Sequence, residues 1–156
     1  EMQRSLVGSE MCIRDSAGSS HIIHLHGELT KVCSSRDPYN PQFIKELKPE
    51  EYEVKMGDKA GDGTQLRPFI VWFGEAVPEI ETAIRYVEKA DIFVIIGTSL
   101  NVYPAAGLLH YVPRGAEVYL IDPKPVDTHT SRSIHVLRKG ASEGVEELKQ
   151  LLIPAP

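Results

Sequence analysis

Cysteine is scarce in this 156-residue chain, which carries only Cys12 and Cys33 and has no CxxC pair. Two distant thiols do not support a disulfide framework, so a reducing cytoplasm is the predicted location. Long apolar runs are also missing, since the longest, 69–73 and 92–96, have five residues each, whereas about 20 are needed to cross a bilayer. The first residues lack the basic start and apolar middle of a signal peptide. The sequence therefore predicts no membrane partner.

Positive charge is not concentrated anywhere in the sequence. Lys and Arg never form a run longer than a pair, and the formal net charge is −5. A nucleic-acid groove needs a basic stripe, so DNA and RNA are not expected as partners. The remaining composition, 42% hydrophobic and 25% charged, is typical of a globular domain rather than of a disordered chain.

Short apolar runs alternate with helical patterns after residue 68. The last of these patterns predicts a helix from about residue 143, with Ser142 as its N-cap. Strands that alternate with helices of this length predict an α/β fold with an open parallel sheet and helices on its faces. The predicted strands are 69–72, 92–96, 117–121 and 134–137, and the predicted helices are 78–90, about 104–111 and a last one from about 143.

The N-terminal part has weaker patterns. The stretch 21–26 alternates in a way that predicts a strand ending at His26. The turn chemistry of 37–41 is followed by a predicted short helix at 42–47. Residues 1–16 fit no element and resemble adapter sequence, so we set them aside.

A glycine and two hydroxyls follow the buried strand 92–96, as Gly97, Thr98 and Ser99. Ligands of open parallel sheets bind outside the carboxyl ends of strands, so this loop is a candidate nucleotide site or else an ordinary turn. Asp122 ends the next strand, near the spacing at which dinucleotide folds place a ribose-binding acid, although the full GxGxxG fingerprint is absent. An acid before a proline is also a common turn former.

Two further motifs carry candidate chemistry. His26 stands directly before a glycine at a predicted strand end, where an imidazole can take a proton from a hydroxyl. Its neighbours His21 and His24 make a metal site conceivable, but the pattern favours an ordinary strand face for these two. The segment VWFGE, 71–75, has two interpretations: a core tryptophan with a turn, or an exposed tip that pairs with an extended peptide.

Taken together, IHLHGEL, LRPFIVWFGE, IGTSLNVYPAAGL and a strand ending in LID resemble the sirtuins, in the order and approximate spacing of that family. The similarity runs from about residue 17 to 156 and looks closest to the bacterial deacylases of the CobB type. It implies the C-terminal part of a sirtuin catalytic domain, with a partial Rossmann-like parallel sheet, helices on both faces and a small insertion module at about 30–68. The implied activity is NAD-dependent deacylation of protein lysines.

The resemblance also implies a role for individual residues. His26 matches the general base, which activates a ribose hydroxyl after the acyl-lysine oxygen has attacked the ribose carbon that loses nicotinamide. The products are free lysine, nicotinamide and O-acyl-ADP-ribose. Asp122 stands where an asparagine is usual beside the adenosine ribose, and it can accept a hydrogen bond there but cannot donate one. The NAD-binding matches are Gly97, Thr98, Ser99, Asp122 and Ala141, and the matches to acyl-lysine peptide contacts are Val71, Trp72, Phe73, Gly74, Glu75 and Val102.

The sequence departs from the family in two ways. Most sirtuins hold a structural zinc with two CxxC pairs, whereas this stretch keeps only Cys33, so the module is expected to be free of zinc. The opening Gly-Ala-Gly loop and the Gln-Asn-x-Asp segment of the family are both absent, and this chain alone is therefore expected to be inactive. One alternative is an NAD- or ADP-ribose-binding Rossmann-like module without catalysis, and another is a purely structural domain.

Overall fold

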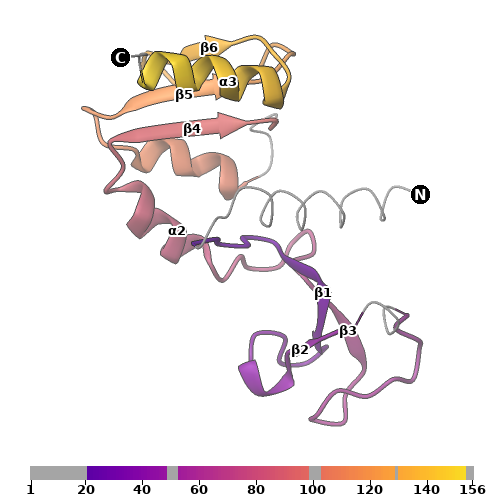
Figure 1. Cartoon of the computed structure of the whole chain (residues 1–156). Coiled ribbons are helices and arrows are strands. Elements are labelled where there is room, and N and C mark those ends of the chain that lie inside the picture. The colour runs from indigo at the N-terminus through magenta and orange to yellow at the C-terminus, as the bar shows by residue number, and fades with distance from the viewer. Residues whose placement is uncertain (1–20, 49–52, 99–102, 129, 154–156) are drawn as a thin grey trace. The chain divides into compact units, whose positions relative to one another are not determined.

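The computed structural model describes residues 21–48, 53–98, 103–128 and 130–153. Two compact units make up the chain, Glu1–Glu79 and Ile80–Pro156. Figure 1 colours the described part from indigo in the first unit to yellow at the end of the second. Each unit has its own sheet, and each is described by itself.

The first unit is built on an antiparallel sheet of three strands in the order β2-β1-β3. Its strands are β1, Gly27–Ser34, β2, Lys45–Glu46, and β3, Leu66–Ile70. Between β1 and β2, the short 3-10 helix η1, Pro41–Phe43, begins after Asn40, whose side chain accepts a hydrogen bond from the Gln42 N–H. The residues at the end of β1 are the most deeply buried of the unit, with Val32, Cys33 and Ser34 fully inaccessible to solvent.

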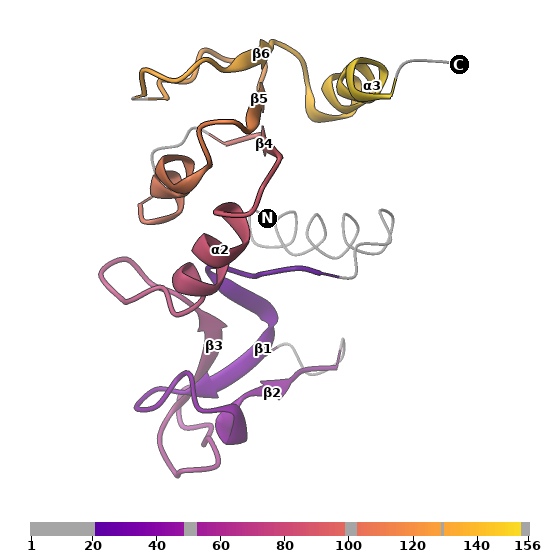
Figure 2. The same ribbon diagram turned by 90° about the vertical axis from the view of Figure 1, so that its left-hand side faces the viewer.

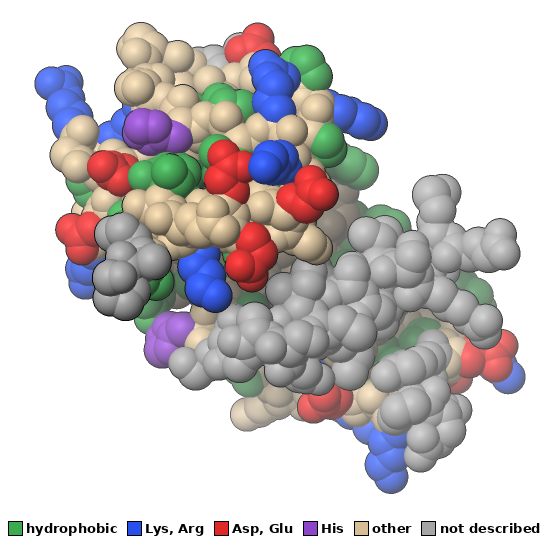
Figure 3. All heavy atoms as spheres, turned by 45° about the horizontal axis from the view of Figure 1, so that its top comes forward, with side chains coloured by type: hydrophobic (Ala, Val, Ile, Leu, Met, Phe, Trp, Pro, Cys, Tyr) green, Lys and Arg blue, Asp and Glu red, His purple; other side chains and the backbone are tan. Residues whose placement is uncertain are grey.

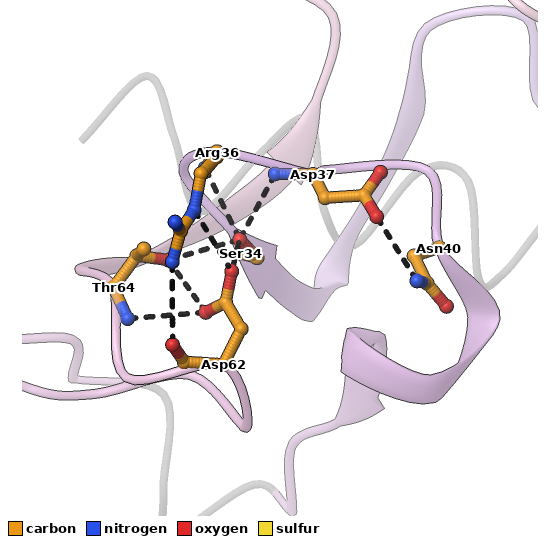
Figure 4. Close-up of polar contacts among 6 residues, drawn as sticks. All are labelled: Ser34, Arg36, Asp37, Asn40, Asp62 and Thr64. Atoms are coloured by element: carbon orange, nitrogen blue, oxygen red, sulfur yellow. Dashed lines mark hydrogen bonds and ion pairs between the residues drawn. The ribbon is translucent and has the colours of Figure 1, made fainter.

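A polar cluster at the end of β1 connects that strand to the loop before β3 (Figure 4). The Ser34 hydroxyl donates to the Asp62 carboxylate over 2.8 Å and accepts the backbone N–H groups of Arg36 and Asp37. Thr64 donates to the other Asp62 oxygen from its hydroxyl and from its N–H, over 2.6 and 3.0 Å. Arg36 Nε lies 3.7 Å from the Asp62 carboxylate, and a terminal nitrogen of the same guanidinium donates to the Asp62 carbonyl over 3.4 Å. Hydrogen bonds therefore satisfy a serine that is completely buried.

The second unit is a parallel sheet of three strands in the order β4-β5-β6. One α-helix precedes the strands, a 3-10 helix connects β4 to β5, and a second α-helix follows β6. The bounds are α2, Ile80–Val87, β4, Ile92–Ile96, η3, Ala105–Tyr111, β5, Glu117–Ile121, β6, His135–Leu137, and α3, Ala141–Leu152. The parallel sheet confirms the predicted α/β class.

Helices cover both faces of this sheet, as Figure 2 shows with α3 and η3 on opposite sides. Strand β5 is buried from Val118 to Ile121, and alternate residues point to opposite faces. Val118 and Leu120 pack into one cluster with residues of α2 and η3, whereas Tyr119 and Ile121 pack with Leu148 of α3. The predicted arrangement with helices on both faces is confirmed.

Several predicted element positions are wrong. Residues 21–24 are irregular and 25–26 form a turn, so the strand begins where the predicted one ends, at Gly27. The predicted helix at 42–47 is the short η1 followed by β2, because only three residues take helical form. Ser142 does not cap α3: the N-cap position belongs to Gly140, which has no side chain to accept a hydrogen bond.

Acidic and basic side chains are interspersed on the face drawn in Figure 3, together with single hydrophobic groups. The strand predicted at 69–72 is found at Leu66–Ile70, so it begins three residues and ends two residues earlier, and the strand predicted at 134–137 is His135–Leu137, which begins one residue later. In the part of the chain that the structure describes, no helix has the length and apolar character needed to span a membrane.

Candidate functional site

His26 occupies an exposed turn directly before β1. The next residue, Gly27, has a φ of 82°, a conformation that glycine adopts without penalty. A Cβ at this position would lie 2.2 Å from the carbonyl oxygen of Phe69 on β3. Only glycine therefore allows β1 to approach β3 here, and this close approach fixes the backbone that carries the imidazole.

The structure brings His26 next to the start of the predicted peptide-binding segment. Gly27 pairs with Ile70 at the end of the β1-β3 ladder. One residue further, the Val71 N–H donates to the His26 carbonyl oxygen over 3.0 Å. The candidate base and the segment 71–75 are thus neighbours in one unit, joined by main-chain bonds.

The segment 71–75 leaves the sheet as a turn with two exposed aromatic side chains. Trp72 is 51% exposed and Phe73 is 100% exposed. Gly74 has a φ of 91°, and the Glu75 N–H closes the turn onto the Trp72 carbonyl over 3.0 Å. The predicted Phe73-Gly74 turn is confirmed, whereas the interpretation of Trp72 as a core residue is wrong.

Part of the main chain of this turn has hydrogen-bonding capacity left. The Val71 N–H is bonded to His26 and the Trp72 N–H to the Glu75 carboxylate. Within the described ranges, no protein group bonds the main chain of Phe73 or the carbonyl of Val71. Such free main-chain groups, exposed directly after a strand, can pair with an added extended peptide.

Arg67 is a residue of this region that the sequence did not single out. Its guanidinium binds the Glu75 carboxylate with both terminal nitrogens, over 2.7 and 3.0 Å. The Tyr39 hydroxyl donates to the Ala76 carbonyl over 3.0 Å, directly beyond the same turn. A single arginine inside the otherwise apolar strand LRPFI is the sequence signal that could have identified it.

The other two histidines of the motif, His21 and His24, are not part of a metal-binding cluster in the described residues. His24 Nε2 lies 3.8 Å from a Glu28 carboxylate oxygen, and that carboxylate also binds Lys31 over 2.6 Å. Cys33 is buried, and its thiol donates to the Pro68 carbonyl at 3.8 Å. Across residues 21–48, 53–98, 103–128 and 130–153, no three His, Cys, Asp or Glu side chains lie close enough to hold a metal ion.

In the second unit, the predicted cofactor residues follow the carboxyl ends of the parallel strands. The Gly97 N–H, directly after β4, donates to the Ile121 carbonyl of β5 over 3.0 Å. The next residue after Ile121 is Asp122, so Gly97 and Asp122 share one edge of the sheet. Ala141 begins α3 a few residues after β6. Thr98 is half-buried beside Gly97, and the predicted residues Ser99 and Val102 lie outside the described part.

Asp122 forms a turn and keeps one carboxylate oxygen available. Its Oδ1 accepts the Lys124 N–H over 2.8 Å, which confirms the turn-forming interpretation. In the described portion of the chain, no group bonds Oδ2. Gly97 has a φ of 62°, and a Cβ there would meet no atom within 4 Å. This edge therefore offers an open backbone and a free acceptor, which fit a ribose hydroxyl.

Comparison with known proteins gives relatives for most of the chain. A family profile described as "Sir2 family" matches residues 12–104. The "NAD-dependent protein deacylase" of Bacteroides thetaiotaomicron is 94% identical over 144 residues, which are 92% of this chain and 62% of that protein. A protein of the same name from Helicobacter pylori is 43% identical over 141 residues, covering 90% of this chain and 59% of the relative.

Solved structures agree with these relatives. A Sir2 homologue in complex with NAD has a TM-score of 0.71 and 32% identity, covering 90% of this chain and 54% of the other. A mutant Sir2 homologue in complex with ADP-ribose has a TM-score of 0.74 and 30% identity, with coverages of 93% and 59%. The chain thus spans 54–62% of the length of these four proteins. Because the family profile matches more than half of its residues, this chain belongs to the Sir2 family, the sirtuins.

Proposed function

We propose that this chain supplies the catalytic base and part of the NAD site of an NAD-dependent protein-lysine deacylase. The observation that supports the proposal is the main-chain bond between His26 and Val71, which joins a candidate base to an exposed segment with free main-chain groups. Two relatives that match about nine-tenths of the chain are named NAD-dependent protein deacylases. The similar solved structures include complexes with NAD and with ADP-ribose.

For the acyl-lysine peptide we propose contacts with the segment 71–75 and, from the resemblance alone, with Val102. The free carbonyl of Val71 and the free main chain of Phe73 provide hydrogen bonds to an extended acyl-lysine peptide. The exposed Trp72 and Phe73 side chains flank that peptide and cover its apolar groups. Gly74 keeps the tip of the turn without a side chain, and Glu75 anchors it.

NAD is the second substrate, and when bound it provides the ribose that accepts the acyl group. Gly97, Thr98 and Ser99 would hold it through backbone and hydroxyl groups. Asp122 would accept a hydrogen bond from the adenosine ribose with Oδ2, and Ala141 would contact the adenine. The carboxyl ends of parallel strands are the usual place for such a ligand in an open α/β sheet.

His26 would act on the ribose as a general base. An exposed imidazole in a fixed turn can remove the proton of a hydroxyl while that oxygen attacks the acyl carbon. The complete reaction consumes one acyl-lysine, one NAD and one water, and it releases lysine, nicotinamide and O-acyl-ADP-ribose. The proposed insertion module at about 30–68 has a single thiol, Cys33, so we expect it to hold no zinc.

The test uses a chimera in which the matched 144-residue segment of the Bacteroides relative is replaced by the corresponding residues of this chain. We expect the chimera to deacetylate an acetyl-lysine peptide in the presence of NAD and to form O-acetyl-ADP-ribose, detected by mass spectrometry. His26→Ala should abolish product formation. His24→Ala is the matched control, because this histidine contacts Glu28 rather than the peptide segment.

Two outcomes would reject the proposal. A chimera that binds NAD in calorimetry but never turns over, while the intact relative does, supports a binding module without catalysis. Equal turnover by the His26→Ala variant and the unmodified chimera assigns the base to another residue.

A further inference from the structure

An ion pair of two side chains lies beneath the exposed turn at 71–75. Arg67 is on β3, opposite Cys33 of β1, and its side chain is only 17% exposed. Its two terminal nitrogens contact the two oxygens of Glu75 over 2.7 and 3.0 Å. A bidentate pair of this kind fixes the orientation of the carboxylate as well as its distance.

The same carboxylate also holds the peptide segment directly. Oε2 of Glu75 accepts the Trp72 N–H over 3.0 Å, while the Glu75 N–H bonds the Trp72 carbonyl. The hydrogen bond from Arg67, and after it the one from Trp72, holds the pKa of the Glu75 carboxyl below its usual value. The carboxylate is therefore charged near neutral pH and connects β3 to the turn.

Apart from the main-chain bond of Val71 to His26, little else holds the turn in place. Phe73 is fully exposed and Trp72 is half exposed, so these side chains gain little from packing. Gly74 adds a flexible residue at the tip. Beyond that main-chain bond, the polar contacts of Arg67, Glu75 and Tyr39 are the ones that fix the conformation of the turn.

We infer that Arg67 is a positioning residue for the acyl-lysine peptide, acting through Glu75 on Trp72 and Phe73. The inference rests on the proposed function, because the peptide is the ligand of this segment. A turn that is ordered before the peptide arrives avoids the entropy cost of ordering upon binding. Loss of Arg67 should therefore weaken peptide binding and leave the chemical step almost unchanged.

Steady-state kinetics of the chimera test this inference. For Arg67→Gln, we expect the KM of the peptide to rise about tenfold, with kcat within about twofold of the unmodified chimera and the KM of NAD unchanged. Arg67→Lys keeps the charge but not the planar fork, so its peptide KM should be intermediate. Lys31→Gln is the matched control, since it removes another cation that pairs with a glutamate in the same sheet.

A second measurement reports on the turn without any turnover. Trp72 is the single tryptophan of this chain, so acrylamide quenching of its fluorescence observes the turn directly. We expect quenching to increase in Arg67→Gln and to stay unchanged in Lys31→Gln. Circular dichroism melting identifies any variant that fails to fold.

The outcomes separate the two proposals. If the unmodified chimera is inactive, the proposed function fails and the role of Arg67 in peptide binding fails with it. If the chimera is active and Arg67→Gln has the peptide KM of the Lys31→Gln control, the inference alone is overturned. A loss of kcat with no change in peptide KM also overturns it.

Discussion

At position 27 a side chain would collide with the backbone of the neighbouring strand. The Cβ of an alanine would lie 2.2 Å from the Phe69 oxygen, and the positive φ adds a strain of about 1–2 kcal/mol. We predict that Gly27→Ala lowers the free energy of unfolding by this strain and, because of the collision, by about a further 1–3 kcal/mol. Urea unfolding followed by the fluorescence of Trp72 measures this, because both residues lie in the first unit.

Gly63→Ala provides the matched control for this substitution. Gly63 has a φ of 79°, close to that of Gly27, but no atom lies within 4 Å of its Cβ position. The control therefore includes the conformational strain without the collision. Equal destabilisation by both variants would show that the contact with β3 is not tight.

Asp62 should make the stability of the first unit depend on acid. Hydrogen bonds from Thr64, and after it from Ser34, lower the pKa of this carboxyl from 3.8 to about 2. Because the pKa is lower in the folded than in the unfolded chain, the charged Asp62 carboxylate stabilises the fold fully above the unfolded pKa of about 4. This stabilisation is lost as the pH falls from about 4 to about 2. NMR titration of the Asp62 carboxyl checks the pKa directly.

Removing the Asp62 carboxylate tests the same dependence of stability on pH. In Asp62→Asn, the part of the acid destabilisation that belongs to this carboxyl should disappear, and the free energy of unfolding at neutral pH should fall. Glu46→Gln removes an exposed carboxylate from the same unit and serves as the control. An Asp62→Asn variant with the acid profile of the unmodified chain contradicts the account.

Asp122 combines a structural and a binding role, which two substitutions can separate. Asp122→Asn keeps an oxygen that can accept the Lys124 N–H and adds a donor for a ribose hydroxyl. Asp122→Ala loses both contacts. In the chimera we predict that the KM of NAD rises about tenfold for Asp122→Ala and changes little for Asp122→Asn. Equal NAD KM values for both variants would remove Asp122 from the proposed NAD site.

At the scale of elements, Gly144 determines how closely α3 packs on the sheet. In an open helix, Gly→Ala stabilises by about 1 kcal/mol. Here the Cβ of an alanine would lie 2.2 Å from Cγ2 of the buried Ile121. We therefore predict the opposite sign: Gly144→Ala destabilises the second unit by about 1–3 kcal/mol.

Circular dichroism melting gives the sign of this change, with Ser142→Ala in the exposed first turn of the same helix as the control. The control should melt at or above the temperature of the unmodified chain, since alanine has the higher helix propensity. Stabilisation by Gly144→Ala would contradict the close packing of α3 against β5.

Two strands of the second unit, β4 and β5, could be predicted from the sequence because their apolar residues follow one another almost without interruption. Run 92–96 is apolar throughout and run 117–121 is apolar after Glu117, and the structure has strands at Ile92–Ile96 and Glu117–Ile121. Alternation in 21–26 is a weaker signal, since a short irregular segment followed by a turn shows the same pattern here. There the pairing of Gly27 with Ile70 decides where the strand begins, and such tertiary pairing is not visible in local periodicity.

The candidate site could be predicted where a motif lies within one stretch of sequence. The position of His26 before a glycine and the turn at Phe73-Gly74 follow from local chemistry. The pair of Arg67 and Glu75 could not be predicted in this way, because its geometry depends on how the chain turns back after β3. The hydrogen bonds of the buried Ser34 hydroxyl could not be predicted for the same reason, since its partners Asp62 and Thr64 lie in a loop that is distant in the sequence.

At the scale of the whole molecule, the activity of this chain by itself stays a prediction. The relatives are longer, and the chain spans 62% of the Bacteroides protein. The sequence resembles the family without its Gly-Ala-Gly and Gln-Asn-x-Asp segments, so we expect no deacetylation by the isolated chain under conditions in which the chimera is active. NAD-dependent turnover by the isolated chain, lost in His26→Ala, would contradict this expectation.

The central claim is that His26 acts on the ribose only after nicotinamide has left. The most direct measurement compares, in His26→Ala of the chimera, the exchange of labelled nicotinamide into NAD with the release of O-acetyl-ADP-ribose from an acetyl-lysine peptide. The account predicts that exchange persists while product release falls at least about a hundredfold, the lower range for loss of a general base. Product release at the unmodified rate, or loss of exchange together with product, would contradict the assigned role of His26.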